Sequence, residues 1–229
     1  EGFKIYVVGR NLAHLQATAE KYPKQIHCLA WDLTDMGFQS TIRAWITEKN
    51  LDFLIQNAGT VEPLQGLMTV TPAALQAALD INVTAPLALL QNLSPLLKKS
   101  RVLHISSGGA HQAIAGLGPY CISKAAFYML KQALNAELPD AVLVGSVMPG
   151  IVATPMQTRL IAHAPLACRE YMQNMAQAKR SVMPAQAAEF ANYVLLKTHD
   201  AAFTQNEWDI YNTDLHPLWL GGETLPQPL

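Results

Sequence analysis

Tyr120 and Lys124 are the residues whose types and spacing most directly suggest chemistry. Four residues make about one helical turn, so the phenol and the ammonium project from one face of a helix. A cation held beside a phenol lowers the pKa of the tyrosine towards working pH. Such a tyrosine can donate a proton to a carbonyl group that is being reduced. The alternative is an ordinary solvated pair on a helix surface.

Two serines, Ser106 and Ser107, precede this pair. They follow an apolar run at residues 102–105, which has the composition of a buried strand, and they lead into a glycine-rich loop. A hydroxyl at the end of a strand, such as that of Ser107, could hold the carbonyl oxygen. The alternative is that both serines only cap turns.

Composition limits the possible partners. The 229 residues suit one domain, residues 1–229, because half of them are apolar and only 14% are charged. The formal charge is −1 and the only basic cluster is Lys98, Lys99 and Arg101, so nucleic acid and anionic membranes are not expected partners. The longest apolar stretch, residues 141–152, is too short to span a bilayer.

The three cysteines and seven histidines define no redox or metal site. The cysteines are odd in number and widely spaced, and no signal-peptide pattern is visible, so we expect a cytoplasmic protein. The histidines show neither an HExxH motif nor a pairing with cysteine, so no metal site is expected.

Apolar runs alternate with helical patterns along the chain. This order predicts an α/β fold with a doubly wound, mostly parallel sheet and helices on both of its faces. Strands are expected at residues 3–8, 26–31, 52–56, 102–105, 141–148 and 207–212, and helices at residues 12–22, 34–50, 71–97, 120–138 and 184–197.

Pro86 falls inside the helical pattern of residues 71–97. A proline has no N–H to donate, so the carbonyl four residues earlier, that of Asn82, is expected to lack its helical partner. This carbonyl would then be available to a water molecule. The alternative is an ordinary polar residue at a proline kink.

Other motifs stand in a fixed order around the Tyr120 helix: Asn-Ala-Gly at residues 57–59, a serine thirteen positions before Tyr120, and Pro-Gly-x-Val-x-Thr at residues 149–154. With these motifs the chain resembles the short-chain dehydrogenase/reductase family over nearly its whole length. The segments YCISKAAFYMLKQALNAELP, PGIVATPMQ and EWDIYN resemble the sepiapterin reductase and benzil reductase branch.

The chain departs from this family at its beginning. The family opens with a strand and a TGxxxGxG loop whose amides cradle the dinucleotide pyrophosphate, and neither is present here. In the family's strand order that strand lies between the strands at residues 3–8 and 52–56. We expect about thirty upstream residues, roughly one strand-loop-helix unit. The alternative is a natural short form with impaired cofactor binding.

The resemblance implies catalytic roles for four residues. Tyr120 is the proton donor, Lys124 lowers its pKa and holds the nicotinamide ribose, and Ser107 orients the carbonyl. Asn82 holds a water that leads protons towards Lys124.

The resemblance also implies a cofactor site. Arg10 lies where the family reads the adenosine ribose, and Gly9 stands where NAD-preferring members carry an acid, so NADP(H) is expected rather than NAD(H). Arg10 could equally be a solvated side chain, and Asp32 and Thr154 could be turn or helix-cap residues. The remaining expected contacts are Asp32 and Leu33 at the adenine, Asn57, Ala58 and Gly59 along the cofactor, and Pro149, Gly150, Val152 and Thr154 at the nicotinamide.

The substrate is expected to be a small ketone or dicarbonyl, pterin-like or aromatic. Asp209 falls where the sepiapterin reductase branch anchors the pterin amino groups, although it could be only a strand-edge charge. The resulting hypothesis is an NADPH-dependent carbonyl reductase that forms a homodimer or homotetramer through the helices at residues 71–97 and 120–138. The alternatives are a non-catalytic dinucleotide-binding or interaction protein and an NAD-dependent alcohol dehydrogenase.

Overall fold

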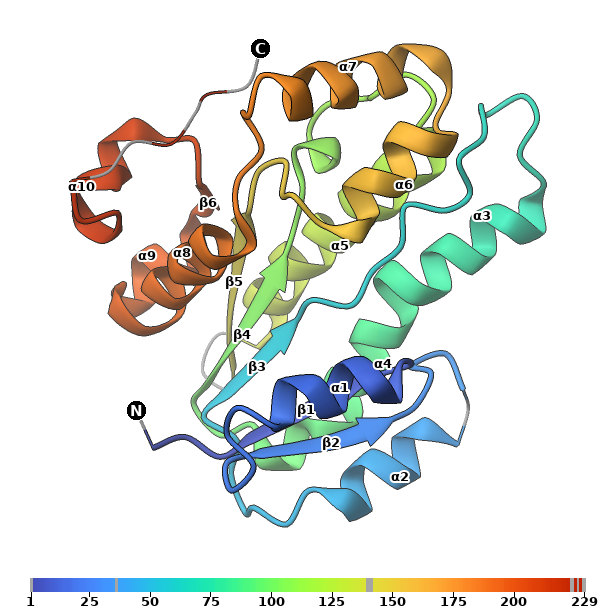
Figure 1. Ribbon diagram of the computed structural model, residues 1–229. Helices are drawn as coiled ribbons and strands as arrows, with labels where there is room; N and C mark the ends of the chain where they lie inside the picture. Colours follow the sequence, from blue (N-terminus) through green and yellow to red (C-terminus); the bar gives the residue numbers. More distant parts are fainter. Residues whose placement is uncertain (1, 36, 139–141, 223–224, 226, 228–229) are drawn as a thin grey trace.

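The computed structural model describes residues 2–35, 37–138, 142–222, 225 and 227, and its strands form two parallel sheets (Figure 1). Ala141, expected to open a strand, lies outside the described residues. One sheet pairs β1 (Ile5–Gly9) with β2 (Ile26–Ala30). The other has the order β3 (Phe53–Gln56), β4 (Ser100–Ile105), β5 (Val142–Met148) and β6 (Glu207–Asp209).

The α/β class and the parallel pairing are as predicted, and the strands fall into two sheets on either side of the position where the family's first strand is expected. Among the described residues, no hydrogen-bonded ladder joins the sheet of β1 and β2 to the sheet of β3 to β6. Ile5 of β1 is 43% exposed and Ile55 of β3 is 48% exposed, although both belong to apolar strands. A further strand between β1 and β3 would cover such positions, and it stays a prediction.

Helices cover both faces of the four-stranded sheet (Figure 1). On one face Val102 of β4 packs with Leu134 of α5 (Gly118–Glu137). On the other face the next residue, Leu103, packs with Phe190 of α8 (Pro184–Lys197) and Phe203 of α9 (Asp200–Gln205). The remaining helices away from the 72–96 run are α1 (Leu12–Ala19), α2 (Phe38–Trp45), α6 (Pro155–His163), α7 (Leu166–Gln177) and α10 (His216–Trp219).

A long helical run combines α3 (Pro72–Leu79), a π-helical turn (Asp80–Thr84) and α4 (Ala85–Leu93). It begins as predicted, with the Thr71 hydroxyl accepting a hydrogen bond from the Ala74 amide. By length and composition alone, residues 72–96 could span a membrane. In this fold the run packs against α5 and α2, and a core helix of a globular protein meets the same criterion.

Two expected elements are shorter than predicted because side chains turn the backbone before or after them. The helix expected at residues 34–50 spans only Phe38–Trp45, since Asp32 accepts from the Thr34 amide and Asp35 from the Gly37 amide. The strand expected at residues 207–212 ends at Asp209, whose carboxylate accepts from the Tyr211 amide at 2.9 Å.

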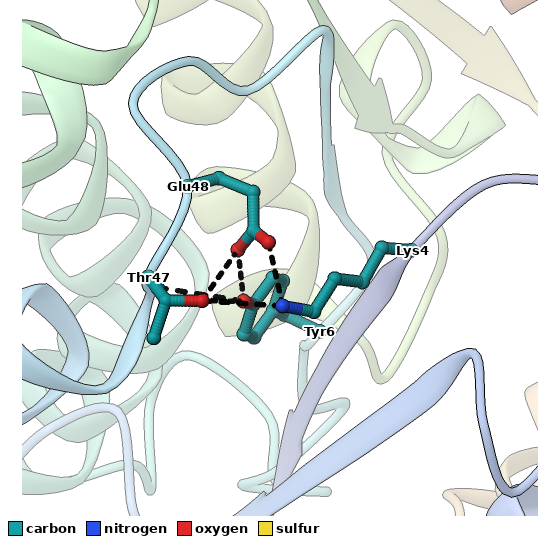
Figure 2. Close-up of polar contacts among 4 residues, drawn as sticks. All are labelled: Lys4, Tyr6, Thr47 and Glu48. Atoms are coloured by element: carbon teal, nitrogen blue, oxygen red, sulfur yellow. Dashed lines mark hydrogen bonds and ion pairs between the residues drawn. The ribbon is translucent and has the colours of Figure 1, made fainter.

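A polar cluster ties the start of β1 to the segment after α2 (Figure 2). Lys4 Nζ lies 2.6 Å from Glu48 Oε1 and 3.1 Å from Thr47 Oγ1, and the Tyr6 hydroxyl also donates to Glu48. These hydrogen bonds, from Lys4 first, lower the pKa of Glu48 to about 2. Since the cluster faces solvent, we expect it to align β1 more than to stabilise the fold.

Candidate active site

The first turns of α5 bring Tyr120 and Lys124 together, as the sequence predicts. Gly118 and Pro119 open the helix, and Lys124 Nζ lies 6.0 Å from the centroid of the Tyr120 ring. Lys124 is only 7% exposed, and its ammonium donates a 2.8 Å hydrogen bond to the carbonyl of Ile105 at the end of β4. The pair therefore sits at the carboxyl end of the sheet, where ligands bind in open α/β folds.

Ser107 stands beside Tyr120, whereas Ser106 does not. The Ser107 hydroxyl accepts from the Gly109 amide at 3.1 Å, so it caps the 3₁₀ turn Gly108–Ala110, and it lies close enough to the Tyr120 phenol to lower the pKa of that phenol. Ser106 Oγ is buried and has no hydrogen-bond partner within the described part of the chain. Gly109 permits this approach, because a Cβ there would lie 3.3 Å from Tyr120 Cε1.

The prediction that the pKa of Tyr120 is lowered overall is wrong. Burial raises the pKa of Tyr120, and the Ser107 hydroxyl offsets this only in part. Burial also lowers the pKa of Lys124 to about 8, and the ammonium is held on the Ile105 carbonyl. For both Tyr120 and Lys124, the cost of removing the charged form from water exceeds the stabilisation that neighbouring groups give to that form. Tyr120 is consequently a protonated phenol at neutral pH, which is the form that a proton donor needs.

Asn82 connects three elements of the site. Its side chain accepts from the Thr60 amide at 2.8 Å and donates to the Thr60 carbonyl at 2.9 Å and to Ser123 Oγ at 2.8 Å. Ser123 in turn donates to the carbonyl of Tyr120 at 2.8 Å. The long helical run, the loop after β3 and α5 are thus fixed to one another.

The helical run accommodates Pro86 with a π-helical turn that the sequence did not predict, and the freed Asn82 carbonyl stays a prediction. The helix widens into the π-helical turn Asp80–Thr84, in which the Ala85 amide donates to the Asp80 carbonyl. The wider turn carries the Asn82 side chain into the interior, where it is 2% exposed. The contacts described at this turn are therefore those of the Asn82 side chain.

Gly59 lies at the centre of this group. A Cβ at Gly59 would be 3.2 Å from Asn82 Oδ1 and 3.8 Å from Lys124 Nζ, so only glycine leaves the space open. Asn57 and Ala58 precede it at the end of β3 and are exposed. The structure therefore brings Gly59 of this segment to two of the four candidate catalytic residues, Asn82 and Lys124.

Arg10 and Asp32 lie together on the other sheet, just after β1 and β2. Arg10 Nη1 is 4.0 Å from Asp32 Oδ2, and the arginine side chain is largely exposed. Asp32 also forms a local turn, and hydrogen bonds from the Thr34 amide and hydroxyl lower its pKa. Leu33 is half-buried and packs against the core cluster of α2 and α4. Asp32 thus forms a turn, which is the alternative to an adenine contact given above. Arg10 has a solvent-accessible guanidinium.

The Pro-Gly-x-Val-x-Thr segment forms a loop against β6 and α6. Gly150 has φ +77°, and a Cβ there would lie 2.8 Å from the Tyr211 ring, whose hydroxyl accepts from the Ile151 amide. Thr154 occupies the cap position of α6 but makes no capping bond. Its hydroxyl donates to Val152 O at 3.3 Å, and it lines an open cavity of about 840 Å³ with Ala153, Pro155, Gln157, Thr158, Arg159, Ala162 and His163.

Asp209, the expected substrate contact, is half-buried at the end of β6. Its carboxylate accepts from the Tyr211 amide, so the structure gives it a turn-forming role. A contact with substrate stays a prediction.

The residues present fit a dinucleotide cofactor by the chemistry of their donors and by shape. Arg10 supplies an exposed cation suited to a phosphate, and Lys124 supplies a buried ammonium suited to ribose hydroxyls. Gly59 leaves room beside that ammonium that a side chain would fill.

Comparison with known proteins agrees with this geometry. A family model described as short chain dehydrogenase matches residues 1–164. The chain belongs to the short-chain dehydrogenase family. It is 31% identical over 160 residues to an uncharacterized oxidoreductase of Schizosaccharomyces pombe, covering 69% of this chain and 64% of that protein. The chain therefore matches less than two thirds of the length of this relative.

Two further similarities bear on this short-chain dehydrogenase. A benzil reductase ((S)-benzoin forming) of Bacillus cereus is 29% identical over 170 residues, covering 68% of each chain. The crystal structure of a short-chain dehydrogenase/reductase of Saccharomyces cerevisiae superposes with a TM-score of 0.82 at 21% identity, covering 96% of this chain and 90% of that one. The latter supports the fold alone.

Several residues of this dehydrogenase's site were missed by the sequence analysis. Thr60 and Ser123 hold Asn82, and Gly109 makes room for the Tyr120 ring. Neither Thr60 nor Ser123 could be tied to Asn82 from the sequence, because these hydrogen bonds span 22 and 41 positions.

Proposed function

We propose that this short-chain dehydrogenase reduces a small ketone or dicarbonyl with NADPH and that Tyr120 donates the proton. The observation that carries this proposal is a buried, protonated phenol between the Ser107 hydroxyl and the Lys124 ammonium, at the carboxyl end of the sheet. NADPH, when bound, supplies the hydride. The residues of the chain then orient the carbonyl and move the proton.

Each of the four residues has a physical task. Ser107 holds the carbonyl oxygen in reach of the phenol, and both hydroxyls stabilise the negative charge that develops on that oxygen. Tyr120 gives its proton to the oxygen as the alcohol forms. The Lys124 charge favours the phenolate that remains. Asn82 fixes the loop beside Lys124 and lies on the route by which protons would return to it.

For the cofactor, we propose that Arg10 pairs with the 2′-phosphate of NADPH, since no carboxylate stands at Gly9 to repel it. Asp32 and Leu33 would lie at the adenine, Asn57, Ala58 and Gly59 along the dinucleotide, and Pro149, Gly150, Val152 and Thr154 at the nicotinamide. Two similar proteins support this choice. A 28% identical relative is an NADPH-dependent pterin aldehyde reductase of Arabidopsis thaliana, and a short-chain dehydrogenase of Shigella flexneri was solved with NADP.

For the substrate, we propose an aromatic diketone or a pterin-like carbonyl, in line with the benzil reductase and the pterin aldehyde reductase that the chain resembles. Asp209 would accept hydrogen bonds from the amino groups of a pterin ring. We also propose a homodimer or homotetramer, because α5 presents the exposed apolar side chains of Ile122 and Met129. A cytoplasmic location is proposed as well.

The test is NADPH oxidation by the full gene product with benzil, other vicinal diketones and pterin aldehydes. We expect turnover with NADPH and at least about tenfold lower kcat/KM with NADH, since one charge-assisted pair separates them. Arg10→Ala should remove this preference, whereas Arg43→Ala, an exposed arginine on α2, should not. Tight NADPH binding without turnover on the whole panel would favour a non-catalytic binding protein, and a preference for NAD with alcohols would favour an oxidative enzyme.

A further inference from the structure

A row of polar side chains crosses the interior of the four-stranded sheet. Gln56 of β3 pairs in register with His104 of β4, His104 with Ser146 of β5, and Ser146 with Glu207 of β6. Register partners on parallel strands point to the same face, so these four residues, the polar row, lie side by side. The face is the one that α5 covers, because the Phe127 ring of α5 stacks on His104 at 4.1 Å.

Two buried lysines of α5 lie over the polar row. Lys124 is 7% exposed and Lys131 is 2% exposed, and they are two helical turns apart on one face. Lys131 Nζ donates a 3.4 Å hydrogen bond to the carbonyl of Asn206, the residue before Glu207, and lies 5.9 Å from the centroid of the Tyr128 ring. Two ammonium groups held away from water need an opposite charge nearby.

Glu207 is the carboxylate of the polar row, and its side chain is only 6% exposed. One oxygen accepts a 2.9 Å hydrogen bond from Ser146 Oγ. The other bonds to His111 Nε2, and the His111 ring packs edge-on against Tyr128 of α5. His111 lies directly after the 3₁₀ turn that carries Ser107 and Gly109 against Tyr120.

Charge effects connect the same groups. Burial lowers the pKa of both Lys124 and Lys131, and the charge of Glu207 raises each in return. The titratable groups gathered around this carboxylate are His111 from the loop, Lys124, Lys131 and Tyr128 from α5, and His104 from β4.

We propose that Glu207 is a positioning residue of the active site: its buried carboxylate is the counter-charge that keeps Lys124 protonated and, through His111, it fixes the loop that presents Ser107. Only the expected effect of Glu207 on turnover rests on the proposed function. The charge relation between Glu207 and Lys124 can be measured in the protein without any substrate.

The test is a pH titration of the lysine side chains by carbon and nitrogen NMR in the full gene product. The Lys124 signal is assigned by its loss in Lys124→Met. We expect a wild-type midpoint near pH 8. Glu207→Gln should lower that midpoint by about one pH unit or more, because a buried opposite charge on the sheet face beneath α5 is removed. Glu189→Gln, an exposed carboxylate of α8, should leave it unchanged and serves as the matched control.

A second pair of variants keeps the proposal falsifiable if Glu207→Gln does not fold. Lys131→Met removes a like charge and should raise the Lys124 midpoint. His111→Gln keeps the Glu207 carboxylate and should leave that midpoint unchanged, but it should lower kcat/KM several-fold by releasing the Ser107 loop.

An unchanged Lys124 midpoint in folded Glu207→Gln would overturn the inference, whatever the turnover. If that variant does not fold, an unchanged midpoint in Lys131→Met would overturn it. Absence of turnover in a protein whose midpoints move as expected would overturn the proposed function and leave the inference standing.

Discussion

The two faces of the four-stranded sheet are built from adjacent residues of the same strands, yet their chemistry differs. Towards α5 the sheet presents the polar row, with two buried lysines above it. Towards α8 and α9 the next residues along, Ile105, Val147 and Trp208, are apolar and pack with Phe190 and Phe203. Alternation along each strand therefore separates a face with the buried polar row from a largely apolar face, on which the Arg101 guanidinium of β4 lies over the Phe203 ring and donates to the Leu195 carbonyl.

The comparison indicates which face of the sheet contributes most to folding stability and which face contains destabilising groups. The largely apolar face buries large side chains, and Phe203 fits so closely over Gly145 that a Cβ there would lie 2.5 Å from its ring. The polar atoms without partners among the described residues of this face are the indole nitrogens of Trp208 and Trp219. The α5 face leaves both ring nitrogens of His104 and Gln56 Oε1 without partners among the described residues. Such groups are destabilising, so we expect substitutions on the two faces to have opposite effects.

The largest expected effect on the α5 face is that of Lys124→Met. We expect kcat/KM to fall by about a thousandfold, equivalent to about 4 kcal/mol, because the phenolate loses its adjacent cation. Folding stability at pH 7 should instead rise by about 1 kcal/mol, since the folded state binds the Lys124 proton less tightly than the unfolded state. This gain should shrink as the pH rises from about 8 to 10.5. Urea unfolding measures it, and a variant less stable than its parent would contradict the account.

On the apolar face, Phe203→Ala should lower the free energy of unfolding by about 3–4 kcal/mol, because it empties a fully buried site. The kcat/KM of the folded fraction should stay within about twofold of the parent, since Phe203 does not contact the α5 side of the sheet. Paired urea titrations and initial rates would check this. A large loss of kcat/KM with unchanged stability would mean that the two faces are not separable in this way.

A smaller expected effect is the pH dependence of folding stability that is due to His104 on the α5 face. Burial lowers the pKa of His104 to about 3, so between pH 6.5 and 3 the unfolded state binds a proton that the folded state does not. Stability due to this group is present above pH 6.5 and is lost as the pH falls. His104→Phe keeps the ring stack on Phe127 and should flatten the acid limb by up to about 1.4 kcal/mol per pH unit. Parallel acid limbs for variant and parent, measured by urea unfolding between pH 6.5 and 5, would show that His104 is not buried in neutral form.

Local signals in the sequence predicted local structure well. The proline at the start and the apolar spacing gave α8 its observed bounds, Pro184–Lys197, and the pairing of Tyr120 with Lys124 followed from helical spacing alone. The start of α2 was placed too early because two aspartates turn the chain before Phe38. The π-helical turn that precedes Pro86 was not predicted, because the sequence does not show how a helix adjusts to an internal proline.

The electrostatics of the site depended on contacts that no local pattern contains. The pKa of Tyr120 moves opposite to the prediction because burial, a tertiary property, outweighs its neighbouring cation. The bond between His111 and Glu207 joins positions 96 residues apart, through a strand register that the sequence leaves open. One hint was available: β3, β4 and β5 each carry a single polar residue near the carboxyl end of an apolar run, and these residues become register partners.

The central claim is that one phenol on the α5 face donates the proton, and Tyr120→Phe tests it most directly. Steady-state NADPH oxidation with a vicinal diketone and urea unfolding should be measured on the same preparations of variant and parent. The account predicts a fall in kcat/KM of about 10²–10⁴-fold with a free energy of unfolding within about 1 kcal/mol of the parent. A variant that is equally stable and equally active would show that Tyr120 is not the donor.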